Sequence, residues 1–563
     1  MDVSRTKRQD TRRKTLAAAS ALALIASASS AQAITYQVGP TRMYRELTAV
    51  AGMLNAGDIV EVDPGMYMAV RFTRAGTTAM PITIRGIVPS GGARPVIQGG
   101  ANSVELAGNN YVLENFEIRN GTSRCVFHHA DNIVIRNTVV HDCPRQGILG
   151  ADQDSGDLTL EYVEVYRSGG GTQDHQIYMA TDEVAYPGSV FRMQHCYVHD
   201  GVGGNAVKSR AERNEIYYNW IEGALYHELE LIGPDPGGAP AGWTEARARE
   251  DSDVVGNVLR ATNTFSIVRV GGDGTGQSLG RYRFVNNTFI SNAGGSAVMR
   301  VFDGIESIEM HNNVFFATGG TVNVSRQVEA RWVAGEVFEG SNNWIAMGAT
   351  NIPMGFRGTI TGPDARLTNA MAQDYRPAAG SPLINAGVAT TTSPAGRAFP
   401  RPLALPMAEP PLRALTLPGA ARPRNTMGMI DLGAFESGGS GPMPDSGVVP
   451  PGDSGVVPPG DSGVVPPGDS GIGPRDASPM LDATSPADTG VPTDDASSPS
   501  DSGGAPRDAN NPSDSGSSAD GGTRPTMMGG CGCSVPSRED RAPRWAAWAI
   551  VALGLAMKRR RAT

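Results

Sequence analysis

The sequence predicts an all-β fold, a right-handed parallel β-helix solenoid, over residues 34–437 of the 563-residue chain. Two observations predict it: short strand-like segments recur, and an asparagine recurs within them. Val112–Ile118 and Phe284–Ile290 each have alternating apolar residues around that asparagine. A single coil of such strands cannot bury its inner face, so coils stack in parallel and share a core of Val, Ile and Phe.

The recurring asparagine marks one turn of the coil. An Asn in the same turn of each coil can hydrogen-bond its neighbours and satisfy turn backbone groups. Tyr162 and His195 take the equivalent place in two intervening turns. A β-propeller is the alternative, but its blades need four strands and a steadier period. The aligned asparagines are Asn115, Asn137, Asn219, Asn257, Asn287, Asn313 and Asn343.

Both ends of the solenoid have recognisable segments. Tyr44–Leu54 is predicted to be a short amphipathic helix, and the strand-like run Ile59–Val62 follows it. Near the other end stand the segments 374–387 and 431–436. These features resemble the opening and closing motifs of the pectate-lyase-like β-helix superfamily, in which a helix caps the first coil. The resemblance covers roughly residues 35–437 and implies the fold rather than an activity.

Composition limits the partners. The formal net charge is −9 and the pI is near 5.5, so we expect no basic surface for nucleic acid. Five cysteines are too few for a disulfide scaffold in a chain of this length. Cys125 and Cys143 either pair across neighbouring turns or remain free buried thiols.

The N-terminus has the three parts of a signal peptide. A cationic region from Arg5 to Lys14 precedes the apolar run Leu16–Ala28, and Ala31-Gln32-Ala33 supplies a cleavage site before Ile34. The alternative is an N-terminal membrane anchor, but the apolar run is short for spanning a bilayer. We therefore expect residues 1–33 to be removed and the protein to be secreted.

The C-terminal part is a linker followed by a tail. The sequence Asp-Ser-Gly-Val-Val-Pro-Pro-Gly occurs three times in 445–468, and residues 438–530 lack the apolar side chains that ordering requires. We expect a disordered spacer. In the tail, 531–563, Cys531-Gly-Cys533 precedes the apolar run Trp545–Met557 and a basic cluster at 558–561.

This order of parts resembles the MYXO-CTERM sorting signal of myxobacterial surface proteins. The resemblance implies a cell-surface protein held at the outer envelope through its tail, with a processing protease as a partner. The apolar run of 13 residues is shorter than the roughly 20 that span a bilayer, so a transmembrane helix and a processed tail both remain open.

Three segments distant in sequence carry the candidate site. They are 175–179, 205–210 and 227–231, with Ile177, Val207 and Leu229 aligned as inward-facing. Side chains alternate along a strand and coils stack about 4.8 Å apart. We therefore expect a row on the outer face, together with flanking side chains. The row is Tyr178, Lys208 and Glu230, and Arg210 and Glu228 lie beside it.

Such a cluster suits β-elimination of a uronic-acid polysaccharide. Arg210 would bind the substrate carboxylate through two hydrogen bonds, and Lys208 would remove the proton at C5. Arg210 and partial burial would lower the proton affinity of Lys208. Tyr178, His175 or His227 would assist proton transfer.

Calcium is the cofactor that this interpretation allows. Glu228 and Glu230 would hold Ca²⁺, which prefers carboxylate oxygens. The cluster resembles, in residue types, polysaccharide lyases of the chondroitinase-B and alginate-lyase type. Their resemblance implies a lysine base, an arginine and a glutamate-bound calcium. In this chain the glutamates follow the lysine by a full coil.

Two other interpretations stand beside the lyase. Lys–Glu neighbours on adjacent strands are ordinary ion pairs worth a few tenths of a kcal/mol. A non-catalytic carbohydrate-binding solenoid or adhesin would present such a face without a groove. In either case we expect an acidic polysaccharide as the partner and a monomeric protein.

Overall fold

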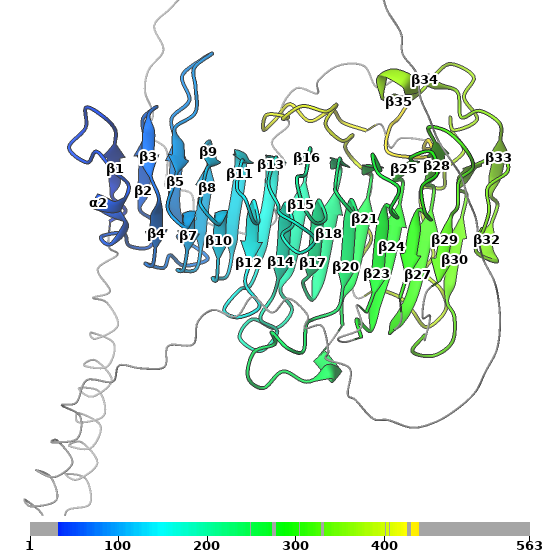
Figure 1. The fold of residues 1–563 in the computed structure, drawn as a ribbon, viewed down its shortest axis with the longest axis horizontal. Coiled ribbons are helices and arrows are strands. Elements are labelled where there is room, and N and C mark those ends of the chain that lie inside the picture. Colours follow the sequence, from blue (N-terminus) through cyan, green and yellow to red (C-terminus); the bar gives the residue numbers. More distant parts are fainter. Residues whose placement is uncertain are drawn as a thin grey trace, which may run out of the picture. The chain divides into compact units, whose positions relative to one another are not determined.

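Each coil contains three strands, and the coils stack in parallel. The computed structural model describes residues 32–437 except 248, 273–276, 303, 328–331, 400, 405 and 425–428. Residues 1–31, the linker and the tail therefore lie outside the described residues, as do the predictions made for them. The strands form two long parallel sheets, so the prediction of a parallel β-helix is confirmed (Figure 1).

The 10-stranded sheet, here sheet B, provides the third strand of each coil. Its inward positions are the apolar Val70, Val104, Val126, Ile148, Ile177, Val207, Leu229, Val268 and Met299, all aligned in register. The strands are β4 (Val70–Phe72), β7 (Asn102–Leu106), β10 (Arg124–His128), β12 (Ile148–Gly150), β14 (Ile177–Ala180), β17 (Val207–Arg210), β20 (Leu229–Ile232), β23 (Val268–Gly271), β26 (Met299–Val301) and β29 (Ser325–Gln327).

The 23-stranded sheet, here sheet A, has two arms that meet at a sharp corner. The first arm contains β1 (Thr35–Val38), β2 (Ile59–Val62), β5 (Ile82–Gly86), β8 (Tyr111–Glu114), the first halves of β11 (Ile133–His141) and β13 (Leu158–Tyr166), β15 (Val190–Gln194), β18 (Arg213–Tyr217), β21 (Asp251–Val255), β24 (Gly280–Val285), β27 (Ile305–His311), β30 (Phe338–Ser341) and β32 (Gly355–Arg357).

The second arm follows the corner in each coil. It contains β3 (Met66–Met68), β6 (Val96–Gln98), β9 (Glu117–Arg119), the second halves of β11 and β13, β16 (Tyr197–His199), β19 (Trp220–Glu222), β22 (Val258–Arg260), β25 (Thr288–Ser291), β28 (Val314–Ala317), β31 (Trp344–Ala346) and β33 (Ile360–Gly362).

One residue at the corner turns the chain, and it has a positive φ. Asn tolerates this left-handed conformation best among non-glycine residues, and Gly256 adopts it at φ +69° without a Cβ penalty. Tyr162, His195 and Tyr218 also take this place, and their rings stack with centroids 4.9 and 5.4 Å apart. The corner residues are Asn115, Asn137, Tyr162, His195, Tyr218, Gly256, Asn286, Asn312 and Asn342.

The predicted asparagine ladder is present, one position after the corner. Asn219, Asn257 and Asn287 are fully buried, and each donates from its side chain to the Oδ1 of the next at 2.9–3.1 Å. Asn313 and Asn343 continue it. Placing Asn115 and Asn137 in this ladder was wrong, because they are corner residues with positive φ; they form their own bond of 2.7 Å.

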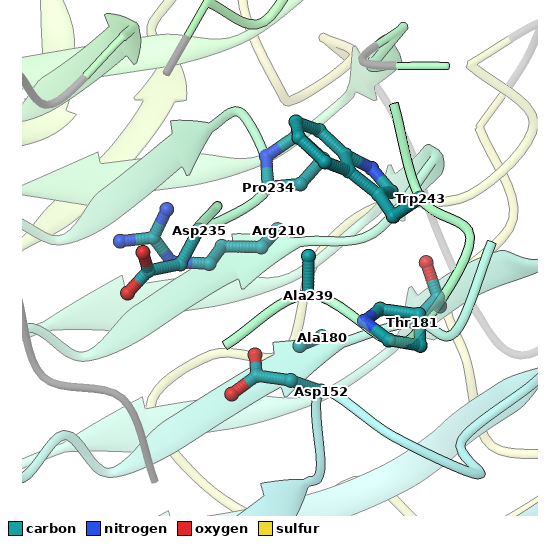
Figure 2. Close-up of a pocket in the computed structure, with 9 residues that line it drawn as sticks. Asp152, Ala180, Thr181, Arg210, Pro234, Asp235, Ala239 and Trp243 are labelled. Carbon is teal, nitrogen blue, oxygen red and sulfur yellow. The ribbon is translucent and has the colours of Figure 1, made fainter. Parts of the chain in front are cut away.

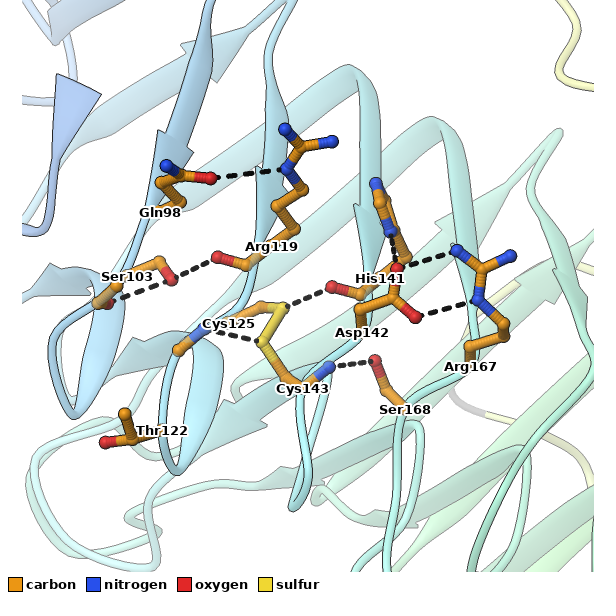
Figure 3. The surroundings of a disulfide bond; sticks show 12 residues. Gln98, Ser103, Arg119, Thr122, Cys125, His141, Asp142, Cys143, Arg167 and Ser168 are labelled. Carbon is orange, nitrogen blue, oxygen red and sulfur yellow. Dashed lines mark hydrogen bonds and ion pairs between the residues drawn. A yellow bond between two sulfur atoms is a disulfide. The ribbon is translucent and has the colours of Figure 1, made fainter. Parts of the chain in front are cut away.

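The two cysteines of neighbouring coils are joined. Cys125 and Cys143 form a disulfide with their Cα atoms 5.6 Å apart (Figure 3). The backbone N–H of Cys143 donates to the hydroxyl of Ser168 at 3.4 Å. Of the two alternatives left open by the sequence, the structure has the bonded one. Cys196 is free and buried in the core.

Both ends of the solenoid differ in detail from expectation. The capping helix is a single turn, α2 (Thr48–Ala51), shorter than predicted, and it buries Val50 and Ala51 over the first coil. The closing segments contain the antiparallel pair β34 (Leu367–Asn369) and β35 (Asp374–Pro377), joined by the 3₁₀ turn η2 (Ala370–Ala372). They return over earlier coils, where Phe435 and Tyr375 pack on Trp220. Among the described residues no helix has the length and apolarity to cross a membrane.

Candidate functional site

The predicted row lies on the outer face of sheet B. Tyr178, Lys208 and Glu230 are paired in register on β14, β17 and β20, so this prediction is confirmed. The register continues to Arg269 and Arg300 on β23 and β26. The row therefore contains three cations and one carboxylate in five adjacent coils, and the sequence alignment missed its arginine end.

Lys208 lies between an aromatic ring and a carboxylate. Its Nζ is 5.0 Å from the centre of the Tyr178 ring and 3.7 Å from Oε2 of Glu230. Its side chain is 13% exposed, whereas Tyr178 is 3% exposed. Within the predicted trio, Lys208 thus has the largest opening to solvent.

Arg210 occupies the next outward position on β17. Its Nε donates to the hydroxyl of Tyr178 at 3.1 Å, and one terminal nitrogen donates to the carbonyl of Gly233 at 2.6 Å. Arg210 is 4% exposed because the segment after β20 covers it. The guanidinium, the phenol and the lysine therefore form one contiguous group.

Two histidines line the start of these strands. Nδ1 of His175 accepts from the backbone N–H of Asn205 at 2.9 Å, so its proton is on Nε2. Burial, with the nearby charge of Lys208, lowers the pKa of His175 to about 3. His227 donates from Nδ1 to the carbonyl of Ser266 at 2.6 Å, and burial lowers its pKa. Both imidazoles are neutral near pH 7.

Glu230 is fully engaged by cations and an amide. Asn205 donates to Oε2 at 2.6 Å, and Arg269 ion-pairs with Oε1. Burial opposes ionisation of this carboxyl, but the charges of Lys208 and Arg269 outweigh burial and lower its pKa. Glu230 is therefore ionised and compensated within the protein.

Glu228 does not lie beside the row, and its predicted outward orientation was wrong. β20 begins at Leu229, so Glu228 and its counterpart Gln176 belong to the turn before a strand, where alternation does not apply. Glu228 is fully buried and neither of its carboxylate oxygens has a hydrogen-bond partner. Burial raises its pKa well above the ordinary value, so the group is neutral.

These two glutamates do not fit a shared calcium ion. Ca²⁺ takes six to eight oxygen ligands, with ionised carboxylates among them. Glu228 is fully buried in the turn before β20, and Glu230 already bonds to Asn205, Lys208 and Arg269. Within the part of the chain that the structure describes, no three acidic, histidine or cysteine side chains group around a metal position.

A hollow that the sequence analysis missed adjoins Arg210. Figure 2 shows Asp152 and Asp235 facing it from two loops, under Trp243. Its volume is about 10 Å³, far below the roughly 300–1,000 Å³ of typical ligand pockets. Burial, with the charge of Asp235, raises the pKa of Asp152 to about 6, against the opposing charge of Arg210. Loops have no periodicity, so no sequence pattern pointed to these aspartates.

The segment over this hollow is anchored at one point. Trp243 donates from its indole nitrogen to Oε2 of Glu183 at 2.9 Å, and Arg247, in the 3₁₀ turn η1 (Glu245–Arg247), donates to the carbonyl of Glu183 at 2.8 Å. Burial raises the pKa of Glu183 to about 8, so it holds a proton at neutral pH.

Comparisons with known proteins give likenesses to β-helix carbohydrate enzymes. No protein-family model matches the chain, and no curated protein sequence matches it significantly. A pectate lyase, Pel9A, is similar with a TM-score of 0.40 and 13% identity, covering 72% of this chain and 96% of that one. A XylC–xylose complex has a TM-score of 0.37 and 9% identity, and the match covers 59% of this chain and 87% of that one. A rhamnogalacturonan lyase has a TM-score of 0.33 and 12% identity, and the match covers 55% of this chain and 87% of that one. These values are too low to decide an activity.

Proposed function

We propose that this protein is a lyase that cleaves uronic-acid polysaccharide by β-elimination on the outer face of sheet B. The observation that carries the proposal is the register-aligned row of Tyr178, Lys208, Glu230, Arg269 and Arg300 with Arg210 beside it. The proposal is supported because a potential base, a hydroxyl and several guanidinium groups lie together on one face of the solenoid.

The arginines favour an anionic substrate. Arg269 and Arg300 both lie over the ring of Phe302, 4.2 and 4.7 Å from its centre. Among the described residues Arg300 forms no ion pair, and its buried Nε has no hydrogen-bond partner. Burial and the charge of Arg269 lower the pKa of Arg300. A bound carboxylate would relieve this repulsion through charge-assisted hydrogen bonds.

The reaction needs no metal in this arrangement. A guanidinium neutralises the substrate carboxylate and makes the C5 proton acidic. Neutral Lys208 takes that proton, the C5–H electrons form the C4–C5 double bond, and the C4–O bond breaks. Tyr178 gives its hydroxyl proton to the departing oxygen. Arg210 then stabilises the phenolate through the hydrogen bond from its Nε.

A binding protein without catalysis is the second candidate, favoured by one observation. Tyr178 and Arg210 are almost fully buried beneath the segment that carries Trp243, so a polymer reaches them only if this segment moves. In that case the half-buried arginine end of the row, Arg269 and Arg300, would bind the polymer alone.

One assay separates the two candidates. The chain is incubated with alginate, pectate, chondroitin and hyaluronan, and the ultraviolet absorbance of the unsaturated product is followed. We expect absorbance to rise with at least one polymer and the rise to vanish in Lys208→Ala. No rise with any polymer that the folded protein binds would favour the binding protein.

For localisation, the proposal is a secreted protein displayed at the cell surface or outer envelope. It is supported by the residue patterns at 1–33 and 531–563. Detection of the solenoid by surface proteolysis of intact cells, and its loss to the medium when 531–563 are deleted, tests this part.

A further inference from the structure

The first coil holds the backbone nitrogen of Ile34 against a buried carboxylate. This nitrogen donates to Oδ1 of Asp58 at 2.8 Å, and Asp58 is 1% exposed. The other oxygen of Asp58 accepts from the backbone nitrogen of Asn55, also at 2.8 Å. The carbonyl of Ile34 accepts from the N–H of Ile59 at 2.9 Å, which fixes the start of β1 against β2.

Asp58 has two backbone donors but lacks a cation. None of the ion pairs formed among the described residues includes it, and the nearby Arg74 donates to Leu54 and Asn55 instead. A buried carboxylate is costly unless a positive charge or several hydrogen bonds compensate it. A positive charge on the Ile34 nitrogen would therefore compensate the carboxylate of Asp58.

Removal of the signal peptide would create that charge. The sequence Ala31-Gln32-Ala33 predicts cleavage before Ile34, and Gln32 and Ala33 are exposed. Hydrolysis adds water across the Ala33–Ile34 amide. The carboxylate leaves with Ala33, and the nitrogen of Ile34 becomes an α-ammonium.

We propose that cleavage before Ile34 completes an ion pair between the new α-ammonium and Asp58, and that this pair stabilises the first coil. The ammonium replaces an N–H that already donates to Asp58, so the backbone needs no rearrangement. Processing thereby strengthens the end of the solenoid that has only one neighbouring coil. Cleavage at any other bond leaves Asp58 without its cation.

The sign of the pH dependence follows from the charges at this corner. An α-amino group ordinarily has a pKa of about 7.7–8.0, and pairing with Asp58 raises it in the folded state. The stabilisation is therefore present below about pH 8 and is lost as pH rises through the raised value. The other titratable or charged groups here are Tyr36, Tyr44 and Arg74; burial, then the charge of Asp58, raises the pKa of Tyr36.

The test compares two chains that extend to residue 563, one beginning at Ile34 and one at Gln32. Hydrogen exchange is measured at pH 7 for peptides covering β1 and β2. We expect exchange in the Ile34 chain to be at least about tenfold slower, because charge-assisted bonds contribute more than 1.4 kcal/mol. Equal exchange in the two chains would overturn the proposal.

Matched variants assign the effect to the pair. Asp58→Asn should abolish the difference between the two chains. Asp63→Asn, which breaks the surface pair with Arg42, should leave the difference unchanged. Mass spectrometry of the exported protein should give Ile34 as the first residue. A different first residue, or a difference that survives Asp58→Asn, would overturn the proposal.

Discussion

Lys208 is distinguished from its neighbours by the position of its ammonium group. It lies near both Tyr178 and Glu230, and its side chain is partly open to solvent. Arg269 also ion-pairs with Glu230, and this contact is shorter than the one with Lys208. Lys208 pairs with Glu230 as an ammonium, so it must give up one proton before it can accept the C5 proton of a substrate.

Substitution of this lysine by arginine separates charge from base catalysis. Lys208→Arg keeps the positive charge but cannot accept a proton near neutral pH. We expect polymer binding to be retained and kcat to fall by about 10²–10⁴-fold. Steady-state kinetics across pH test this; an active Lys208→Arg variant with the same pH profile contradicts the assignment.

Arg300 is the residue whose removal should weaken binding without affecting the reacting group. Arg300→Ala removes a guanidinium that has no ion pair among the described residues, so we expect about 10-fold weaker polymer binding. The salt dependence of binding should also decrease. Arg71→Ala is the matched control, because Arg71 lies in register with the row, four coils before Tyr178, and is paired with Glu105. Equal losses in both variants would contradict an arginine-specific site.

At the scale of elements, the segment between β20 and β21 lies over Arg210. Its Trp243 is bound by protonated Glu183. This stabilisation is present below the ordinary carboxyl pKa and is lost as pH rises through about 8, because ionised Glu183 needs solvent. Burial thus favours protonated Glu183 at acidic and neutral pH, against the bond from Trp243, which favours the ionised carboxyl.

Tryptophan fluorescence tests this behaviour. We expect the emission of Trp243, obtained by difference from Trp243→Phe, to shift to the red above pH 8. Glu183→Gln stays neutral at every pH, so its emission should not titrate. An unchanged titration in Glu183→Gln would assign the transition to another group.

Strand periodicity explains how much of the site the sequence could predict. Alternation placed Tyr178, Lys208 and Glu230 on one face, because all three lie inside strands. It failed at Glu228, one residue before β20. Asp152 and Asp235 could not be found, since they reach Arg210 from loops whose paths depend on packing rather than on a repeat.

At the scale of the whole molecule, buried ionisable groups set the pH range of stability. Burial lowers the pKa of His128 and His195 to about 4, so their contribution is lost as pH falls below about 6.5. Burial raises the pKa of Glu228 and Glu250 well above the ordinary value, so their contribution is lost as pH rises above about 4.5. Between about pH 4.5 and 6.5, a rise in pH therefore increases the contribution of the two histidines to stability and decreases that of the two glutamates.

We therefore expect maximal stability at mildly acidic pH, roughly 5–6.5. Thermal unfolding measured in steps from pH 4 to 9 should give a melting temperature that falls on both sides. Replacement of Glu250 by Gln should flatten the alkaline side. A melting temperature that rises continuously to pH 9 would contradict this account.

The repeat also made the overall architecture predictable. Inward apolar residues belong to every coil and buried asparagines to five successive coils, so each copy supports the same interpretation. The return of 378–437 over earlier coils was not predictable in the same way. Its contacts, such as Phe435 on Trp220, join segments more than 200 residues apart and have no periodic signature.

The central claim is elimination by the row on sheet B without a metal. The most direct measurement is the ultraviolet absorbance of the unsaturated product, followed in EDTA for wild type and Lys208→Ala. We predict that wild type forms product at an unchanged rate in EDTA and that Lys208→Ala forms none. Product formation that stops in EDTA, or continues in Lys208→Ala, would contradict the claim.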